Sequence, residues 1–129
     1  MSARKRSCLA KTIESDETTT FQPSIEDVVK WRNILNEEVF GGRCPEFNSV
    51  VIKKRRDSWG QCFGDKVDNY YEIRLERKFK SLTHFLNIVA HEMCHAIEYE
   101  ETDKMTHGKF FWSWKDRLTT KGLELRHKY

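Results

Sequence analysis

The residue pattern with the clearest chemical meaning is the pentad His91-Glu92-Met93-Cys94-His95. On a helix that turns by about 100° per residue, the two histidines lie about 40° apart and one turn from each other, so both imidazoles can reach one metal ion. Zinc accepts neutral imidazole nitrogen and keeps a position open for water when the protein supplies three ligands. Glu92 is placed to take a proton from that water and to pass it to a leaving amine. The pentad therefore predicts a zinc site suited to hydrolysis of peptide bonds.

A third protein ligand has to come from farther along the chain. His107 follows His95 by twelve positions and opens a predicted helix, and the acidic loop before it can fold that helix back over the pentad. The loop acids Glu101 and Asp103 remain alternatives, because carboxylate oxygen also binds zinc. We predict that His91, His95 and His107 are the three zinc ligands and that Glu92 is the catalytic base.

Three other side chains that could bind a metal have simpler explanations. Glu98 points almost in the direction of His91, which makes it eligible as a ligand, but it lies a further turn along the same helix. We therefore expect it to support the ligands from behind or to be solvated. Cys94 is expected to be a structural thiol, because the histidines already occupy that face of the helix. His127 is expected to be solvated.

The predicted helices and strands show how the pentad is held. Ser24 and Asp27 resemble a capping box at the start of one helix, and the pentad lies in a later helix that Ser81 can cap. Thr106 can cap a third helix, which carries His107. The predicted helices cover residues 25–39, 82–99 and 107–121, and the predicted strands cover 50–52, 59–63 and 70–75. Three helices and a small, three-stranded antiparallel sheet make an α+β fold.

The length and composition indicate one domain. The 129 residues leave room for a single core, to which 8 Phe and 4 Trp contribute. Residues 1–22 are predicted to be a disordered polar arm, residues 23–125 the domain, and residues 126–129 a short basic tail. No apolar run reaches the roughly 20 residues that span a bilayer and no signal peptide is recognisable, so we expect an intracellular protein without a membrane partner. The four cysteines are too widely spaced for a zinc ribbon.

The motif residues resemble those of a known family. His91-Glu92-Met93-Cys94-His95-Ala96, followed by His107-Gly108 and Phe110-Phe111, is similar to the SprT-like metallopeptidases, which include the Spartan proteases. The resemblance extends over about residues 23–125. It implies a compact gluzincin-like (minigluzincin) domain, one catalytic zinc between the motif helix and the next helix, three histidine ligands and a glutamate base. Many members continue into a cysteine-rich zinc subdomain, whereas this sequence has no cysteine after Cys94.

The resemblance also implies a substrate and a way to bind it. Members of the family cleave proteins, and several of them cleave proteins that are bound or crosslinked to DNA. In this architecture a strand edge beside the zinc would align the main chain of the substrate, and here we expect that strand to be the one around Tyr71. Tyr70 or Tyr71 could also polarise the scissile carbonyl.

A basic run is the candidate for contact with nucleic acid. Lys53, Lys54, Arg55 and Arg56 precede Trp59, so the run could hold the phosphates of single-stranded or protein-bound DNA while the ring stacks on an unpaired base. The alternative is a solvated turn with the Trp59 ring in the core.

Two other functions remain open at this point. One is a non-catalytic module whose structural zinc and basic surface serve DNA or protein binding, and the other is a protease that cleaves its own arm near Lys11. The intact Glu92 favours an enzyme, because a closed structural site does not need a base at that position.

Overall fold

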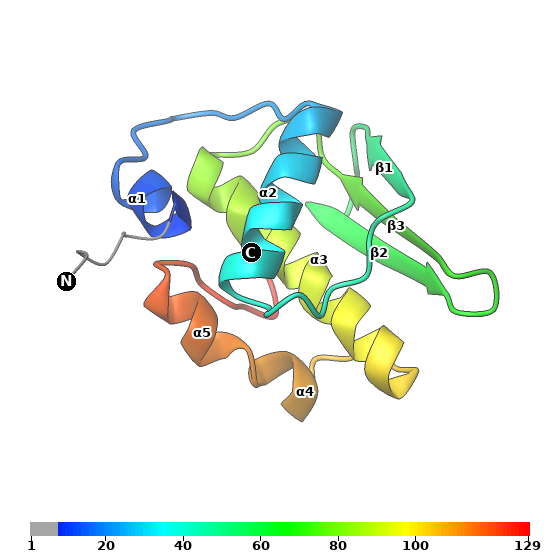
Figure 1. Ribbon diagram of the computed structural model, residues 1–129. Helices are drawn as coiled ribbons and strands as arrows, with labels where there is room; N and C mark the ends of the chain where they lie inside the picture. The colour runs from blue at the N-terminus through cyan, green and yellow to red at the C-terminus, as the bar shows by residue number, and fades with distance from the viewer. Residues whose placement is uncertain (1–7) are drawn as a thin grey trace.

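The computed structural model describes residues 8–129, which form an α+β fold around one long helix (Figure 1). This helix, α3 (Leu82–Thr102), begins after Ser81, whose hydroxyl accepts a hydrogen bond from the backbone N–H of His84 at 3.0 Å. It ends at Asp103, which adopts a left-handed conformation with φ of 65°. The middle of α3 is buried on almost every side, so it is the central element of the core rather than a surface helix.

Helix α2 (Ile25–Glu38) packs against α3 and begins with the predicted capping box. The Ser24 hydroxyl accepts a hydrogen bond from the Asp27 backbone at 3.1 Å, and the Asp27 carboxylate accepts one from the Ser24 backbone at 2.9 Å. Val28 and Leu35 are fully buried on the face toward the core. The predicted extent of this helix is confirmed to within one residue.

The sheet contains β1 (Ser49–Ile52), β2 (Gly60–Asp65) and β3 (Tyr70–Leu75) in the order β1-β3-β2. β2 and β3 are antiparallel, but β1 runs parallel to β3, so the prediction of a purely antiparallel sheet is wrong for that pair. The reason is the path of residues 53–59, which carry the chain past β3 to its other side. The hairpin partner of β3 is therefore β2, and β3 is the central strand.

Strand β2 lies along α3, and two glycines allow the close approach. A Cβ atom on Gly64 would lie 2.5 Å from Cδ2 of Tyr99, and one on Gly60 would lie 3.0 Å from Cγ2 of Ile88. The edge of the sheet is thus held directly beside the helix that carries the pentad.

Residues 8–22 correct the prediction of a disordered arm, whose first seven residues lie outside the described part of the chain. Helix α1 (Cys8–Glu14) buries Leu9 completely in the core. Beyond it, the Asp16 carboxylate accepts hydrogen bonds from the backbone and hydroxyl of Thr18, and from the backbone and hydroxyl of Thr83 at 2.8 and 2.6 Å. Partial burial acts to raise the pKa of Asp16, but the hydrogen bonds from Thr18 and Thr83 lower it to about 2. The segment is ordered by these distant contacts, which its own sequence does not show.

The predicted third helix is broken into two short ones, α4 (Lys109–Trp112) and α5 (Lys115–Thr120). Gly108 occupies the N-cap position of α4 without a side-chain cap, and Thr106 does not cap a helix as predicted. Instead, Thr106 is bonded to a buried carboxylate of α3, described below.

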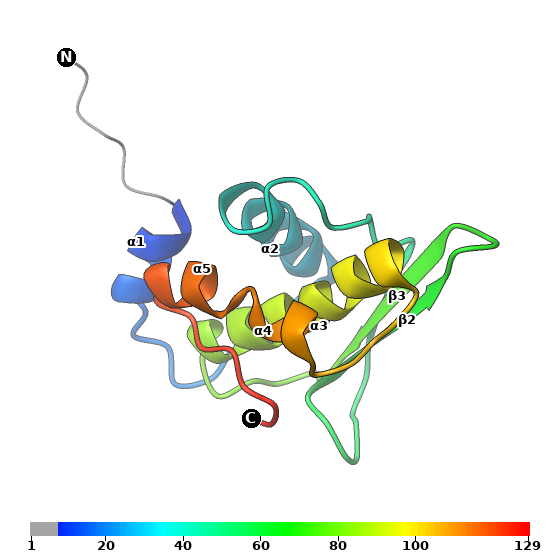
Figure 2. The same ribbon diagram turned by 90° about the horizontal axis from the view of Figure 1, so that it is seen from below.

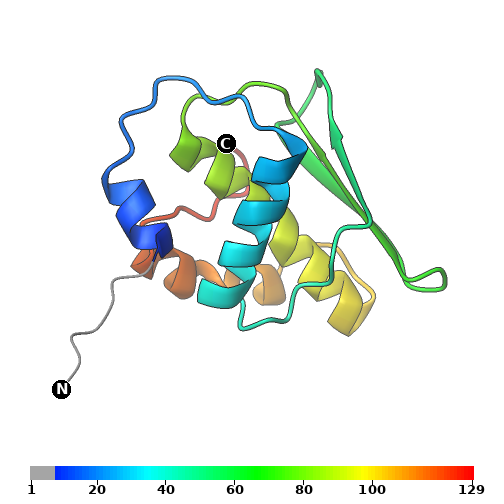
Figure 3. The ribbon, with the colours of Figure 1, turned by 45° about the horizontal axis from the view of Figure 1, so that its top comes forward.

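The C-terminal segment, residues 123–129, returns to the core instead of forming a solvated tail. Figures 2 and 3 show it running from α5 back along the first half of α3. Leu123 and Leu125 are 2% and 6% exposed, and the Glu124 backbone donates to Asn87 Oδ1 at 2.9 Å. The Tyr129 ring is half-buried against the core. Residues 126–129 therefore belong to the folded unit, in contrast to the predicted boundary at 125.

Across the described chain, none of the helices combines the length and the apolar character needed to cross a membrane.

Candidate metal centre

Three histidine nitrogens converge on one point between α3 and the loop that follows it. The Nε2 atom of His91 lies 3.2 Å from that of His95 and 3.4 Å from that of His107, and each histidine offers a nitrogen within 4.8 Å of the other two. Ligands at the usual Zn–N distance of about 2.0–2.1 Å in tetrahedral geometry are separated by about 3.3–3.4 Å. The spacing of these side chains therefore fits a tetrahedral metal ion, and the structure brings together the three predicted ligands.

The loop that delivers His107 is fixed by Glu98. The Glu98 side chain is 4% exposed, and its carboxylate accepts hydrogen bonds from the Thr106 backbone at 2.6 Å and from the Thr106 hydroxyl at 3.1 Å. Because Thr106 directly precedes His107, these bonds hold the histidine over α3. Glu98 is therefore directed to the loop, not to the metal point, and the structure places it behind the third histidine.

The Phe111 ring packs against the imidazole rings of His91, His95 and His107. It is fully buried, and its ring centroid lies 4.9 Å from that of His91, 5.1 Å from that of His95 and 4.7 Å from that of His107. In the sequence, Phe111 stood out only as part of the motif Phe110-Phe111 that follows His107-Gly108. Its contact with the three histidines is decided by tertiary structure, because His107 lies in the loop before α4 and Phe111 within α4.

The electrostatic environment keeps the histidines neutral at physiological pH. Burial, reinforced by the neighbouring histidines, lowers the pKa of His91 to about 3, and burial followed by the charge of His107 lowers that of His95 to about 4. Burial also lowers the pKa of His107. Neutral imidazoles have a free lone pair, so the site does not have to lose protons to bind a metal ion near pH 7.

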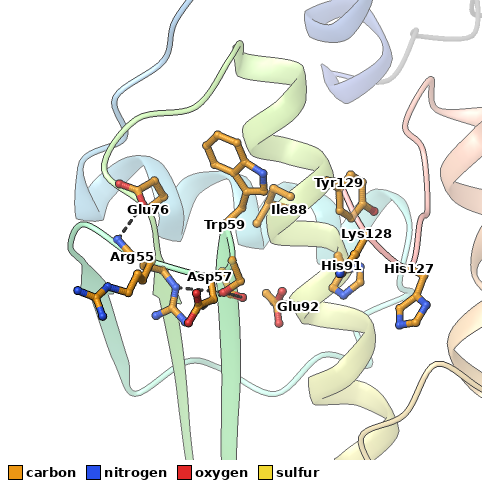
Figure 4. A pocket seen from close by; sticks show the side chains of 13 residues that line it. Arg55, Asp57, Trp59, Glu76, Ile88, His91, Glu92, His127, Lys128 and Tyr129 are labelled. Carbon is orange, nitrogen blue, oxygen red and sulfur yellow. Dashed lines mark hydrogen bonds between the residues drawn. The ribbon is translucent and has the colours of Figure 1, made fainter.

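Glu92 lies next to this cluster, in a cavity of about 570 Å³ (Figure 4). The side chain is 6% exposed, and burial raises its pKa to about 8, partly opposed by the charge of Arg55. Within residues 8–129 the structure shows no hydrogen bond to its carboxylate. The group therefore has no structural partner and faces the cavity beside His91, as expected for a side chain that exchanges protons with a bound molecule.

Two segments far apart in the sequence form the walls of the cavity. On one side lies the β1–β2 loop with Trp59, and on the other the C-terminal segment with His127 and Tyr129 (Figure 4). The His127 ring centroid is 4.2 Å from that of His107, and the Tyr129 ring centroid is 5.4 Å from that of His91. His127 is exposed, as expected for a solvated residue, but it also lies beside His107, because Leu125 and Tyr129 hold the segment on α3.

Comparison with protein families gives an independent result. The model of the SprT-like family matches residues 28–128. The chain belongs to the SprT-like family. The match runs from within α2 to Lys128, so it includes the β1–β2 loop and His127, and it ends one residue before Tyr129. A search of curated proteins found no match.

The SprT-like domain does not use its tyrosines in the way that the sequence suggested. Tyr71 is 1% exposed and its hydroxyl donates to Glu100, and Tyr70 donates to Glu72 at 2.8 Å. Neither residue lines the cavity, and β3 is paired on both sides, so it offers no free edge to a peptide. The free edge beside α3 belongs to β2, whose first residue, Gly60, does line the cavity.

The basic run of this SprT-like domain lies in the β1–β2 loop. Lys53, Lys54 and Arg56 are exposed, whereas Arg55 is held by hydrogen bonds to Glu76 at 2.8 Å and to Gln61 at 2.9 Å. The neighbouring Trp59 is half-buried; its ring centroid lies 4.5 Å from that of His84 and 5.8 Å from that of Phe79. It is therefore neither a free stacking platform nor a full core residue. Arg55, Arg56 and Trp59 all line the cavity.

Proposed function

We propose that this SprT-like protein is a zinc-dependent endopeptidase that hydrolyses peptide bonds of protein substrates. The observation that carries the proposal is the convergence of three neutral imidazoles at tetrahedral spacing beside a buried carboxylate with no structural partner. Three histidine nitrogens, with a glutamate that lines the same cavity as His91, make the donor set of a catalytic zinc site, which leaves one position open. We further propose a domain of the gluzincin type, with the zinc between α3 and α4.

The roles of the side chains follow from their positions. His91, His95 and His107 would hold the zinc, which when bound polarises a carbonyl group and acidifies water. Glu92 accepts a proton from the attacking water and returns it to the nitrogen of the leaving amine. Burial favours the protonated form of Glu92 in the metal-free protein. A nearby dication lowers the pKa of this carboxyl, so the base form becomes available when the site is loaded.

The substrate is proposed to bind as an added strand on the edge of β2. An extended peptide gains main-chain hydrogen bonds from such an edge, largely independently of its sequence. Gly60, at the start of β2, lines the cavity, so a peptide on this edge would pass close to Glu92.

Proteins bound or crosslinked to DNA are proposed as one class of substrate, on the evidence of the β1–β2 loop. Arg56 lines the cavity, and the exposed Lys53 and Lys54 precede it in the same loop, so the loop can neutralise phosphates while a bound protein enters the site. Lys53→Glu with Lys54→Glu is expected to weaken binding of single-stranded DNA and to reduce its salt dependence. Lys30→Glu, on the exposed face of α2, is the matched control. Equal affinities in all three proteins would contradict the proposal for DNA.

A comparison of variants tests the peptidase proposal. Protein purified without added metal is expected to contain about one zinc per chain by elemental analysis, with sharply less in His107→Ala and His95→Ala. Glu92→Gln is expected to keep the zinc and to lose cleavage of an unfolded protein substrate. Full zinc in His107→Ala would move the third ligand to another residue, and cleavage by Glu92→Gln at the wild-type rate would refute the mechanism. Zinc and DNA binding without any proteolysis by the wild type would favour the non-catalytic module.

A further inference from the structure

The C-terminal wall of the cavity has no role in the mechanism above, although its His127 and Tyr129 rings lie 4.2 Å and 5.4 Å, between centroids, from the rings of His107 and His91. We infer that His127 is a further catalytic residue that donates a hydrogen bond to the substrate carbonyl oxygen as this atom gains negative charge. The inference rests on the proposed peptidase function and assigns one more residue of the same site. The step needs only a hydrogen bond, and His127 forms no covalent bond in it.

Two other hydrogen-bond donors that line the cavity, the Tyr129 hydroxyl and the Arg55 side chain, are already engaged. The Tyr129 hydroxyl donates to the Glu124 carbonyl at 2.9 Å and accepts from the Arg126 backbone at 3.1 Å. Arg55 is bonded to Ser58 at 3.2 Å and to Gln61 at 2.9 Å.

His127 differs from these groups because its ring is exposed in the cavity wall. The structure of residues 8–129 shows no hydrogen bond to its side chain, so its N–H group is available to a ligand. Lys128 also lines the cavity, but it has no contact with the histidine ligands and carries its charge on a flexible stem.

The position of the ring agrees with this role. The centroids of His91, His95 and His107 are separated by 4.8–5.3 Å, as rings around one ion should be, whereas His127 stacks on His107 at 4.2 Å with a 50° tilt. His127 is thus not a fourth ligand in this arrangement, and the open position stays free.

Distances set a bound on where the donor can act. The centroid of a ligating imidazole lies about 3.2 Å from zinc, so the His127 ring lies within roughly 7 Å of the metal point. A nitrogen that donates to an oxygen at the open position lies about 5 Å from the ion or closer, which falls inside this bound.

The segment is also preorganised. Leu125, 6% exposed, anchors it on one side of His127, and the half-buried Tyr129 anchors it on the other. A donor that is held in place before the reaction stabilises developing charge without a reorganisation cost. Loss of one such donor typically lowers kcat by about 100–1,000-fold.

The test compares His127→Ala, His127→Gln and Arg126→Ala with the wild type, all loaded with zinc; Arg126 is an exposed cation of the same segment that does not line the cavity. We expect His127→Ala to lower kcat for a peptide substrate by about 100-fold, with KM and zinc content nearly unchanged, because the lost contact exists only in the transition state. His127→Gln, which keeps an N–H donor, should recover part of the lost kcat, and Arg126→Ala should stay within about threefold of the wild type. A change in kcat below threefold in His127→Ala, or a parallel loss of zinc, would overturn the inference.

A second measurement does not depend on turnover. A phosphinic peptide carries a tetrahedral, anionic group in place of the scissile amide, so its affinity reports the same contact in the cobalt-substituted proteins. We expect binding by the wild type, about 100-fold weaker binding by His127→Ala, and no such change in Arg126→Ala. No binding by the wild type, or equal binding by the wild type and His127→Ala, refutes the role of His127, even if the wild type cleaves no peptide. If the wild type is inactive but the difference in phosphinate affinity is found, the peptidase proposal fails and the assignment of His127 as the donor to a bound anion stands.

Discussion

The burial of Glu92 is expected to lower the free energy of unfolding of the metal-free protein. In the folded protein the pKa of this carboxyl is raised from 4.5 to about 8, because burial disfavours the charged form. An acid whose pKa is raised by folding does not reduce the stability of the folded state at pH values below its pKa in the unfolded chain. The cost grows as the pH rises through the window from 4.5 to about 8. With about 1.4 kcal/mol per pH unit, the cost is roughly 1 kcal/mol at pH 5 and roughly 3 kcal/mol at pH 7.

The substitution Glu92→Gln removes this titration and keeps the shape of the side chain. In the metal-free state, we therefore expect the free energy of unfolding of Glu92→Gln to exceed that of the wild type by a margin that depends on pH. This margin should be about 2 kcal/mol larger at pH 7 than at pH 5. Urea unfolding of both proteins at the two pH values, with a chelator present, measures the difference. The comparison cancels the contributions of the histidines, which titrate in both proteins.

Zinc provides the control for this reasoning. A bound dication favours the charged form of Glu92, so the pH dependence of the difference should shrink when the site is loaded. In the metal-free state, the wild type and the variant could instead differ in free energy of unfolding by the same amount at pH 5 and at pH 7. This result would show that folding does not raise the pKa of the Glu92 carboxyl. The account of Glu92 as a buried base would then be wrong.

Two further predictions test the elements around the site. Glu98→Ala, which removes the acceptor for Thr106, is expected to weaken zinc affinity by about 10–100-fold in a chelator competition. Glu101 is exposed, and Glu101→Ala should keep a zinc affinity within about threefold of the wild type. Equal zinc affinities of Glu98→Ala and the wild type would show that the loop is held by other contacts. Leu9→Ala is expected to lower the free energy of unfolding by about 2–4 kcal/mol, because Leu9 is fully buried, and a loss below about 0.5 kcal/mol would mean that α1 does not pack on the core.

The local parts of the structure were accessible from the sequence, because they depend on residues close together in the chain. The capping box of α2 and the serine cap of α3 rest on hydrogen bonds across three positions. The relation between His91 and His95 follows from the four-residue spacing on a helix. The same reasoning failed for residues 106–122, where α4 and α5 replace one helix.

Contacts between distant segments decided the rest. The parallel pairing of β1 with β3 depends on the path of a connecting loop, and the order of α1 depends on burial of Leu9 and on bonds from Asp16 to α3. Neither has a period or spacing in the sequence, since the free energy comes from surfaces that meet only in the folded chain.

The candidate site likewise depends partly on local spacing in the sequence and partly on contacts between distant segments. Residue type and spacing predicted two candidate metal ligands and an adjacent candidate base, because one turn of helix is enough to align them. The position of His107 relied on a loop, and the structure shows that the Glu98 carboxylate, eight residues before Thr106, holds this loop in place. The placement of His127 beside His107 was decided by tertiary structure alone, because it requires two buried anchors to bring the C-terminal segment back across α3.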